Sequence, residues 1–382
     1  ARLQRATSGS LSATAVAGDT VTLKTTRPGV LRISPNDSTG FADSIQIAPT
    51  VGASSFTYYI QGVDTITADS VDVIGTVPAF RPDTARYRVF TPVFDIIFLN
   101  ATANALAAND PFQVRTGTAT SPTGGISVED VLRFGHAPVT ATLATSQASV
   151  AQLVTSSTTG STATVSIGPR QSRSPTTVAT GGVELDYLTT GSTVVTANIP
   201  SFRVLPSDTQ AVTVTAPFAS LSATTVGGGL QFATSGSLSS GNHGGISVVV
   251  KSSSPGIAAV SPNATTAGTD SVIIAVAAGA TSFSYYVQGI EGQTGAVTIR
   301  ATAPGFTDGT ATATVVQPAV DVIFLAGTGS AASTVDDPFQ VRIGYANSPT
   351  NSSMSAEQAL RAGGPGALTV TIQVTDSAAA LL

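Results

Sequence analysis

The feature that most constrains the fold is a long internal repeat. The stretch LQRATSGSLSA at 3–13 returns as LQFATSGSLSS at 230–240, an offset of 227 positions. The run DPFQVR at 110–115 returns unchanged at 337–342, again 227 positions later. Matching segments follow one another along nearly the whole chain. A repeat of this kind predicts an array of similar domains, each with its own core, and not one large core.

A fainter symmetry divides each period into two domains. A motif of Pro, one residue and Phe occurs at 78–80, 200–202 and 304–306, each time between two runs of alternating polarity. The unequal spacings indicate two related domain types, which we call the short type and the long type. The predicted domains are 1–92, short type with its first strand missing; 93–217, long type with a short helix; 218–318, short type; and 319–382, the first half of a long type.

Period-two alternation predicts β-strands throughout. In TGAVTIRATA at 294–303, Val297, Ile299 and Ala301 fall on one face, and Thr298 and Arg300 fall on the other. Runs like this recur every 10 to 15 residues or so, with Gly, Pro, Asn and Asp between them. We therefore predict an all-β chain of antiparallel sandwiches and no alternation of strands with helices.

One short helix is expected in each long-type domain. Ser127 and Ser355 are candidate N-caps, each with Asp130 or Gln358 three residues on, as in a capping box. The other residues of this prediction are Gly135 and Gly363, which would end the helix, and Leu132 and Leu360, which would face the core. The helix would cover an open sheet edge, and contact with a partner is the alternative.

Two stretches resemble a known group of proteins. SPNATTAGTDSVIIAVAAGATSFSYYVQG at 261–289 and SPTTVATGGVELDYLTTGSTVVTANIPSF at 174–202 resemble bacterial Ig-like repeats of large extracellular or cell-surface proteins. The resemblance implies tandem Ig-like β-sandwiches in a rod-like array. It implies no single activity, because such domains serve in stalks, adhesins, filaments and enzyme appendages.

The repeated tyrosine pair is the most conspicuous candidate site. In SSFTYYIQG at 54–62, alternation places Tyr58 toward the core and Tyr59 and Gln61 outward, and the copy at 281–289 places Tyr286 and Gln288 outward. Two adjacent rings on opposite faces cannot form one ligand platform. The sequence leaves Tyr59, Gln61, Tyr286 and Gln288 as candidates for contact with the next domain or the next chain.

Composition excludes several functions. The net charge of −5 and the absence of a basic patch argue against nucleic acid. No apolar run approaches the roughly 18 residues of a membrane span. The chain has no cysteine, and its two histidines, His136 and His243, do not occupy matching positions, so neither a zinc site nor a catalytic triad is indicated. We expect no enzyme and no cofactor.

Three further features have a structural and a functional interpretation. Asn109-Asp110 and Asp336-Asp337 precede the DPFQVR strands and are expected to be turns, with calcium possible but unsupported. The only lysines, Lys24 and Lys251, are equivalent and are expected at exposed strand positions, although a covalent crosslink to Asn or Asp is the alternative. The candidate glycosylation sites are Asn36, Asn100, Asn263 and Asn351.

These observations predict a non-catalytic structural repeat protein of an extracellular filament, appendage or stalk. Short joints near Pro92, Pro217 and Pro318 would limit bending between domains. The two outer domains are incomplete relative to their copies, so either the repeat continues or a neighbouring chain completes them by strand exchange. The alternatives are an adhesin that binds carbohydrate or protein through its loops, and an accessory region of a secreted hydrolase.

Overall fold

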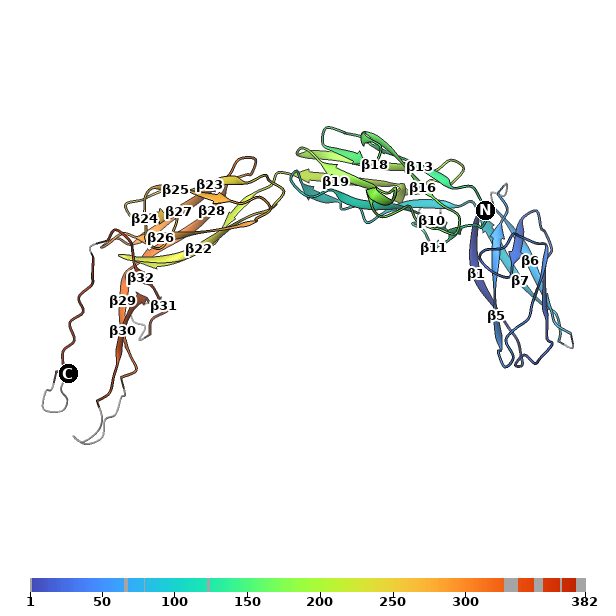
Figure 1. Ribbon diagram of the computed structural model, residues 1–382, viewed down its shortest axis with the longest axis horizontal. Coiled ribbons are helices and arrows are strands. Elements are labelled where there is room, and N and C mark those ends of the chain that lie inside the picture. The colour runs from blue at the N-terminus through green and yellow to red at the C-terminus, as the bar shows by residue number, and fades with distance from the viewer. Residues whose placement is uncertain are drawn as a thin grey trace. The chain divides into compact units, whose positions relative to one another are not determined.

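The structure is a computed structural model, and it describes residues 2–64, 68–78, 80–121, 124–325, 336–346, 353–364 and 366–375. The chain divides into two compact units, Ala1–Thr215 and Ala216–Leu382. Strands dominate both units (Figure 1). Within the described ranges, helix is limited to two 3-10 turns, η1 (Val178–Thr180) and η2 (Pro206–Asp208). The predicted all-β class is confirmed.

The first short-type domain is a sandwich of two four-stranded sheets. Their strand orders are β12-β1-β5-β3 and β4-β2-β6-β7. The strands of the domain are β1 (Leu3–Ser10), β2 (Val21–Thr25), β3 (Leu31–Ser34), β4 (Ser44–Ile47), β5 (Ser55–Gly62), β6 (Ala68–Thr76) and β7 (Asp83–Phe90). The strand β12 (Val131–Leu132) joins the first sheet from the following domain.

The long-type domain that follows is a larger sandwich. One sheet has the order β11-β10-β17-β14-β15, with β8 also paired to β10, and the other has the order β16-β13-β18-β19-β9. The strands are β8 (Val93–Ile97), β9 (Thr102–Asn104), β10 (Asp110–Thr118), β11 (Val128–Glu129), β13 (Val139–Thr145), β14 (Ala151–Val154), β15 (Thr159–Gly160), β16 (Thr162–Ile167), β17 (Val183–Tyr187), β18 (Gly191–Asn198) and β19 (Thr209–Thr215).

The second short-type domain has the same plan with its first strand present. Its sheets have the orders β20-β22-β26-β24 and β21-β28-β27-β23-β25, which match the two sheets of a constant-type Ig sandwich with β21 and β25 added to the second. The strands are β20 (Ala219–Leu221), β21 (Thr224–Gly227), β22 (Leu230–Leu238), β23 (Ile246–Ser252), β24 (Ala258–Ser261), β25 (Ser271–Val276), β26 (Ser282–Gly289), β27 (Gly295–Thr302) and β28 (Gly309–Val316).

The described residues after 317 form one small sheet of the order β29-β30-β31. Its strands are β29 (Pro318–Ile323), β30 (Gln340–Tyr345) and β31 (Ala356–Glu357), and β32 (Ala359–Leu360) pairs with β22 instead. Val320 is exposed on β29, whereas its counterpart Phe94 is fully buried on β8. The difference arises because no second sheet faces β29 among the described residues.

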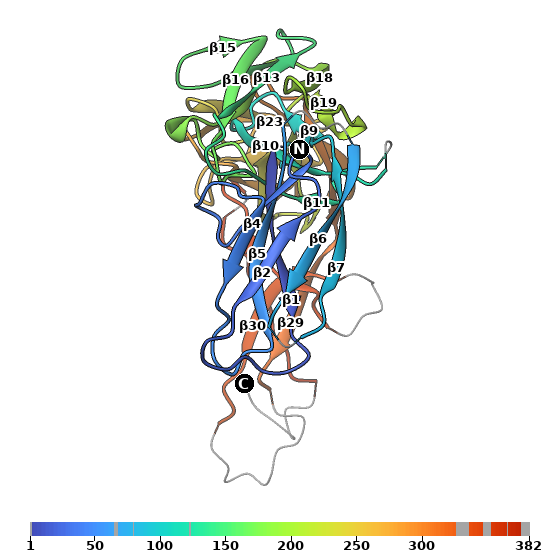
Figure 2. The same ribbon diagram turned by 90° about the vertical axis from the view of Figure 1, so that its right-hand side faces the viewer.

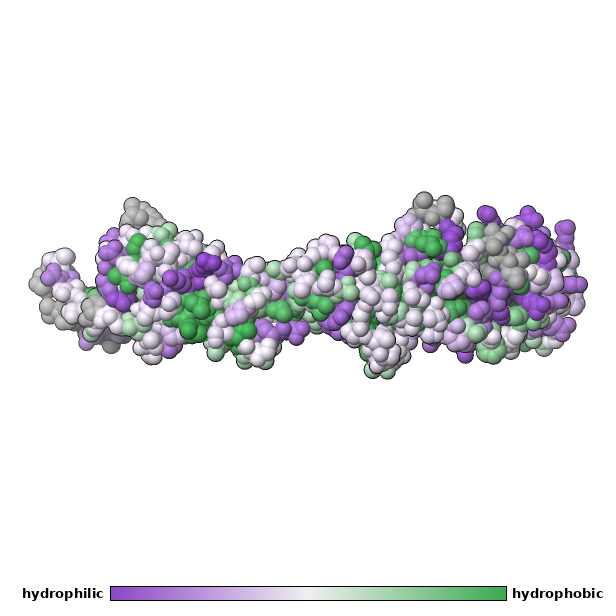
Figure 3. Space-filling model, turned by 90° about the horizontal axis from the view of Figure 1, so that it is seen from above, coloured by the Kyte–Doolittle hydropathy of each residue, from purple (hydrophilic) through white to green (hydrophobic). Residues whose placement is uncertain are grey.

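Alternation decides which side chains enter each core. On β27, Val297, Ile299 and Ala301 are buried and the residues between them are exposed, as the sequence predicts. Tyr58 and Tyr285 are also buried, which confirms that one tyrosine of each pair belongs to the core. On the face seen in Figure 3, hydrophobic residues appear as small patches among polar ones.

The Pro-x-Phe motif closes the 93–217 and 218–318 sandwiches in the same way. Residue 201 of the long type and residue 305 of the second short type both have positive φ, at 68° and 79°. The residue after the motif then donates its backbone N–H to a proline carbonyl before the first strand, Arg203 to Pro92 and Thr307 to Pro217, both at 2.8 Å. The shared corner supports the relation between the two domain types.

The predicted helices at 127–135 and 355–363 are wrong, because the first segment forms β11 and β12 and the second forms β31 and β32. In the first segment, Ser127 donates its backbone N–H to the Thr118 carbonyl of β10, and Leu132 donates its backbone N–H to the Gln171 carbonyl, both at 2.8 Å. These contacts across the sheet replace the i to i−4 bonds of a helix. Gly135 does end the segment, with φ of 72°. Leu132 is buried as expected, but its copy Leu360 is partly exposed.

The core of the second short-type domain offers a matched test. Ile299 on β27 is 1% exposed and Ile273 on β25 is 70% exposed. We expect Ile299→Ala to lower the free energy of unfolding by about 2–5 kcal/mol, through lost burial and a cavity. Ile273→Ala should change it by less than about 0.5 kcal/mol. Urea unfolding measures both, and equal effects would contradict this account of the core.

Candidate functional site: a bridging segment between short and long domains

Residues 127–135 connect the two domains of the first unit, and 355–363 repeat the arrangement in the second. We call each of them the bridging segment. In the first unit, β11 pairs with β10 of the long domain, and β12 pairs with β1 of the short domain through Leu3–Leu132 and Gln4–Val131. In the second unit, β31 pairs with β30, and β32 pairs with β22 through Leu230–Leu360 and Gln231–Ala359. One short stretch thus extends a sheet of each domain.

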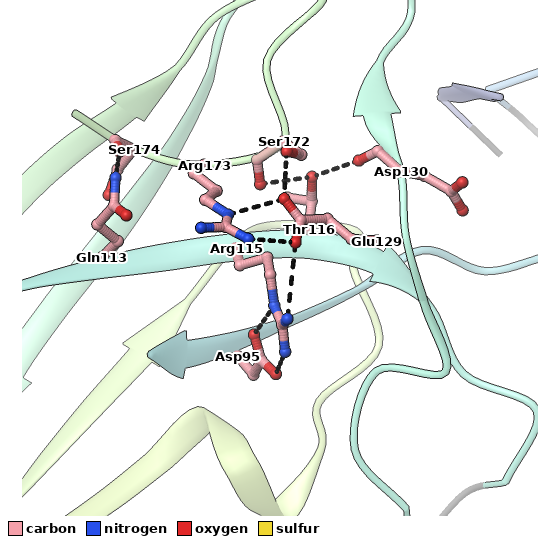
Figure 4. Close-up of polar contacts among 9 residues, drawn as sticks. All are labelled: Asp95, Gln113, Arg115, Thr116, Glu129, Asp130, Ser172, Arg173 and Ser174. Carbon is pink, nitrogen blue, oxygen red and sulfur yellow. Dashed lines mark hydrogen bonds and ion pairs between the residues drawn. The ribbon is translucent and has the colours of Figure 1, made fainter. Parts of the chain in front are cut away.

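A network of charged side chains fixes the bridging segment to the long domain (Figure 4). Arg173 makes two bonds to the Glu129 carboxylate, at 2.8 and 2.7 Å, and the Ser172 hydroxyl donates to the same carboxylate at 2.5 Å. Arg115, the last residue of the DPFQVR motif, binds Asp95 at 3.0 and 2.7 Å and lies 3.6 Å from Glu129. Two arginines therefore converge on one acid of the segment.

This environment strongly favours the ionised form of Glu129. The Arg173 hydrogen bonds, opposed by partial burial and aided by Ser172 and Arg115, lower the pKa of Glu129 to about 2. The carboxylate therefore stays charged over the ordinary pH range. The Arg115–Asp95 pair recurs as Arg342–Asp321, at 3.0 and 2.7 Å.

An ion pair fixes the other end of the segment to the short domain. Arg133 binds both oxygens of Asp64, at 3.0 and 2.9 Å, and its guanidinium lies over the Phe41 ring at 4.2 Å. The copy is Arg361 with Glu291, at 2.7 and 2.6 Å. Each arginine side chain is only 15% exposed, so the bidentate geometry and the burial make these pairs stronger than ordinary surface pairs.

The pKa values of the two acids follow from these contacts. Burial pushes the pKa of Asp64 upward, but the Arg133 guanidinium outweighs it and holds the pKa below its usual range. Arg361 likewise lowers the pKa of Glu291. Both ion pairs are consequently intact at neutral pH.

A pair of buried glutamines links the segment to the repeated tyrosine strand. The Gln61 amide donates to Gln4 Oε1 at 2.9 Å, and the same oxygen accepts the backbone N–H of Phe134 at 2.8 Å. In the second unit, Gln288 donates to Gln231 Oε1 at 3.0 Å, which faces Ala362 N–H at 3.4 Å. The two glutamines in the repeated YYxQG motif thus reach the bridging segment through one intervening glutamine, Gln4 or Gln231.

The middle of the bridging segment differs between the two units. Asp130 is buried and binds Arg5 of β1 at 2.6 and 2.7 Å. Its counterpart Gln358 accepts the backbone N–H of Gly227 and donates to the Thr225 carbonyl, both at 2.8 Å. The Asp130 contact is an ion pair, whereas Gln358 makes hydrogen bonds to backbone atoms of β21. The same position bonds to the short domain in both units by different chemistry.

The four residues predicted to contact the next domain or chain differ in burial: the two glutamines are buried, and the two tyrosines are half-exposed. Gln61 and Gln288 are buried, at 1% and 0% exposed, and do not lie outward as alternation predicts. The reason is that the turn after β24 folds over Gln288, which donates to the Thr266 carbonyl at 3.0 Å, and the equivalent turn bonds Gln4 beside Gln61. Tyr59 and Tyr286 are half-exposed opposite Ala6 and Ala233. Contact of these tyrosines with another chain stays a prediction.

Three of the four predicted glycosylation sites are exposed. Asn36, Asn100 and Asn263 lie at the surface, and Asn351 lies outside the described residues. The Asn263 side-chain oxygen accepts the N–H groups of Thr265 and Thr266, at 3.0 and 2.9 Å, which fixes the turn. Modification of these asparagines stays a prediction.

The remaining candidates occupy structural positions. Lys24 and Lys251 are exposed on strands, next to the buried Leu23 and Val250. The Asp110 carboxylate accepts the Asn100 N–H at 2.8 Å and the Tyr187 hydroxyl at 3.0 Å. The described residues contain no group of three or more His, Asp or Glu side chains placed to hold a metal ion. The calcium expectation therefore gains no support.

The two histidines bond to backbone carbonyls. His136 Nδ1 lies 2.5 Å from the Ala137 carbonyl, and His243 Nε2 lies 2.9 Å from the Ala280 carbonyl.

No helix within the described ranges has the length and apolar character needed to cross a membrane.

Sequence reasoning missed the arginines of the bridging segment. Arg133 and Arg361 occupy matching positions of the repeat, and so do the acids Asp64 and Glu291. A repeated Arg that coincides with a repeated acid would have suggested a pair. The prediction of a helix at these residues hid this pairing, because in a helix Arg133 and Arg361 would point in other directions than they do from a strand.

Comparisons with known proteins do not assign the chain to a family. No protein-family model matches it, and no curated protein matches it in sequence. Solved structures that align with it include the Yersinia pseudotuberculosis adhesin InvE, with 10% identity and a TM-score of 0.21 over 59% of this chain and 58% of that one. Surface layer protein SbsC, domains 4–9, shows 13% identity and a TM-score of 0.22 over 79% and 40%.

The I9–I11 tandem of titin shows 13% identity and a TM-score of 0.21 over 83% of this chain and 94% of that one. The chain spans less than two thirds of InvE and of the SbsC fragment. At such TM-scores the likeness carries no argument about function. The Ig-like assignment depends on the sheet orders described above.

Glu129 allows a test of how the bridging segment is held. Because its pKa is lowered, the carboxylate contributes stability above its unfolded pKa, near 4.3, and this is lost as pH falls toward about 2. We expect Glu129→Gln to cost about 1–3 kcal/mol at pH 7 in urea unfolding, with a deficit that shrinks between pH 4 and pH 2. Glu184→Gln, which changes an acid that accepts a bond from Asn109, is the control. A deficit independent of pH would contradict the charge network.

Proposed function

We propose that this protein is a non-catalytic structural component of an extracellular filament, appendage or cell-surface stalk. The observation that carries the proposal is the bridging segment, which occurs twice and joins a short domain to a long domain each time. Its backbone pairing with two sheets stiffens a joint that would otherwise be a flexible connection. A repeated unit with a stiff internal joint suits a protein that must grow in length and bear load.

The substitutions between equivalent positions of the two units support this proposal. Asp64 becomes Glu291, yet the bidentate ion pair with arginine is kept. Asp130 becomes Gln358, yet the side chain still bonds to the short domain. A contact that persists while its atoms change indicates that the joint, and not a particular ligand chemistry, is what the sequence maintains.

Composition supports the extracellular setting. Charged residues make up 10% of the chain, with Ser and Thr abundant and cysteine absent. Polymer formation by exchange of strands between subunits is the finer form of the proposal.

One observation favours the adhesin alternative. Phe98 and Phe324 are equivalent, largely exposed, and both held at φ near 68°. A bulky residue with positive φ is strained, and exposed aromatic rings are common in binding surfaces. In the first copy, however, Phe98 stacks with Arg173 at 5.7 Å and lies between β8 and β9, where the first strand changes sheets.

Immunogold electron microscopy of the source cells tests the proposal. Antibodies against the chain should label the exterior, along filaments or a continuous surface layer, because the protein is structural along its whole length. Labelling concentrated where cells touch one another or a substrate would favour the adhesin. Labelling confined to the cell interior would contradict both.

A further inference from the structure

A pocket of about 110 Å³ opens at the joint of the first unit. It lies on the sheet whose strands β1 and β5 are labelled in Figure 2. Arg32 of β3 and Gln61 of β5 are directly paired, so their side chains are neighbours on one face of this sheet. The rest of the lining includes the Phe41 ring and the ion pair between Asp64 and Arg133. Polar and charged groups therefore line one small cavity.

Gln61 brings a buried acceptor to this pocket. Its side chain is 1% exposed, and its Oε1 has no hydrogen-bond partner among the described residues. The amide nitrogen is already used, because it donates to Gln4 Oε1 at 2.9 Å. A buried acceptor without a donor is unfavourable, since it has lost water and gained nothing in return. The pocket thus favours a ligand that directs an N–H or O–H group at this oxygen.

The second unit shows the same site in a closed form. Strand pairing makes Ala259 the counterpart of Arg32 and Gln288 the counterpart of Gln61. There, Gly268 donates its backbone N–H to Gln288 Oε1 at 2.8 Å. A Cβ at position 268 would lie 2.8 Å from both the Ala259 Cβ and Gln288 Oε1, so this close approach requires glycine. The equivalent oxygen is consequently covered and bonded by the protein itself.

Two substitutions accompany the pocket in the first unit. Phe41 stands where the second unit has Gly268, 227 positions later, and Arg32 stands where it has Ala259. The Phe41 ring lies under the Arg133 guanidinium, at 4.2 Å, and the turn makes no bond to Gln61 Oε1. Both residues that cover the glutamine in one unit are thus replaced in the other, and a cavity takes the place of the contact.

Arg32 supplies a second binding group. Its Nε donates weakly to the Pro28 carbonyl at 3.4 Å and lies 3.9 Å from the Asp43 carboxylate. Its two terminal nitrogens make no hydrogen bond within the described ranges, and their geometry suits a carboxylate. The Asp64 carboxylate, also in the lining, can accept further hydrogen bonds beyond those from Arg133. The pocket therefore offers a cation at one side and acceptors at the other.

We propose that this pocket binds a small α-amino carboxylate, with its ammonium on Gln61 Oε1 and Asp64 and its carboxylate on Arg32. An α-amino acid carries both charged groups on one carbon atom, which suits anchors on paired residues whose Cβ atoms are about 5 Å apart. A dry cavity of roughly 150 Å³ holds a benzene molecule, so this pocket admits ligands of the size of glycine or serine. The site is separate from the structural role proposed above. Its ligand would contact both the short domain and the bridging segment.

Titration of the full chain with glycine, followed by two-dimensional NMR of its side-chain N–H groups, tests the proposal. We expect saturable shifts of the Gln61 amide and the Arg32 Nε–H. Acetate lacks the ammonium and methylamine lacks the carboxylate, so each should bind about tenfold more weakly or worse, because one charge-assisted hydrogen bond is lost. This comparison of ligands uses the unmodified chain.

The second unit supplies the matched control. Arg32→Ala combined with Phe41→Gly installs the pair of residues found at its closed site. We expect this double variant to lose glycine binding while its thermal unfolding temperature stays the same or rises, because the backbone N–H of position 41 can then bond to Gln61. Arg88→Ala, which removes an arginine outside the pocket, should leave glycine binding unchanged. Absence of saturable shifts with glycine, equal affinity for acetate, or unchanged binding in the double variant would overturn the proposal.

Discussion

The structure of each unit depends on the backbone hydrogen bonds of the bridging segment. Residues 127–135 donate backbone N–H groups to both domains: Ser127 to the Thr118 carbonyl of the long domain at 2.8 Å, and Arg133 to the Arg2 carbonyl of the short domain at 3.0 Å. Sheet pairing uses both domains at once, so the segment cannot leave one of them without exposing unpaired backbone groups. The charged side chains then hold a geometry that the backbone has set. The pair of domains, and not the single sandwich, is accordingly the structural unit.

The duplication separates what the fold requires from what it tolerates. Both units keep Arg133 or Arg361 on an acid, and both keep the glutamine pair that meets the segment. The turn over the glutamines varies: Phe41 stacks with Arg133 in one unit, while Gly268 donates its N–H to Gln288 at 2.8 Å in the other. Buried polar groups are satisfied in both cases, apart from Gln61 Oε1, which has no partner among the described residues. Hydrogen bonding at the joint is therefore conserved more strictly than the side chains that provide it.

Much of the fold could be predicted from period-two alternation, because one face of each strand is buried. The alternation in TGAVTIRATA and the burial of Tyr58 and Tyr285 both followed from it. The joint could not be predicted in the same way. Ser127 and Asp130 have the local pattern of a helix cap, yet pairing with β10 and β1 outweighs that preference. Gln61 is buried for a related reason, since a turn distant in sequence covers the face that alternation assigns to solvent. Contacts between distant segments leave no periodic signal.

The central claim is that a short domain and the long domain after it form one stiff unit, and a distance distribution tests it most directly. Spin labels at Lys24→Cys and Ser149→Cys, both exposed and on different domains, report this joint by pulsed electron resonance. The account predicts one narrow distribution in the intact chain. Adding Arg133→Ala and Asp130→Ala should broaden it, because both side-chain contacts to the short domain are lost. A broad distribution in the intact chain, or one that the two substitutions leave unchanged, would contradict the account.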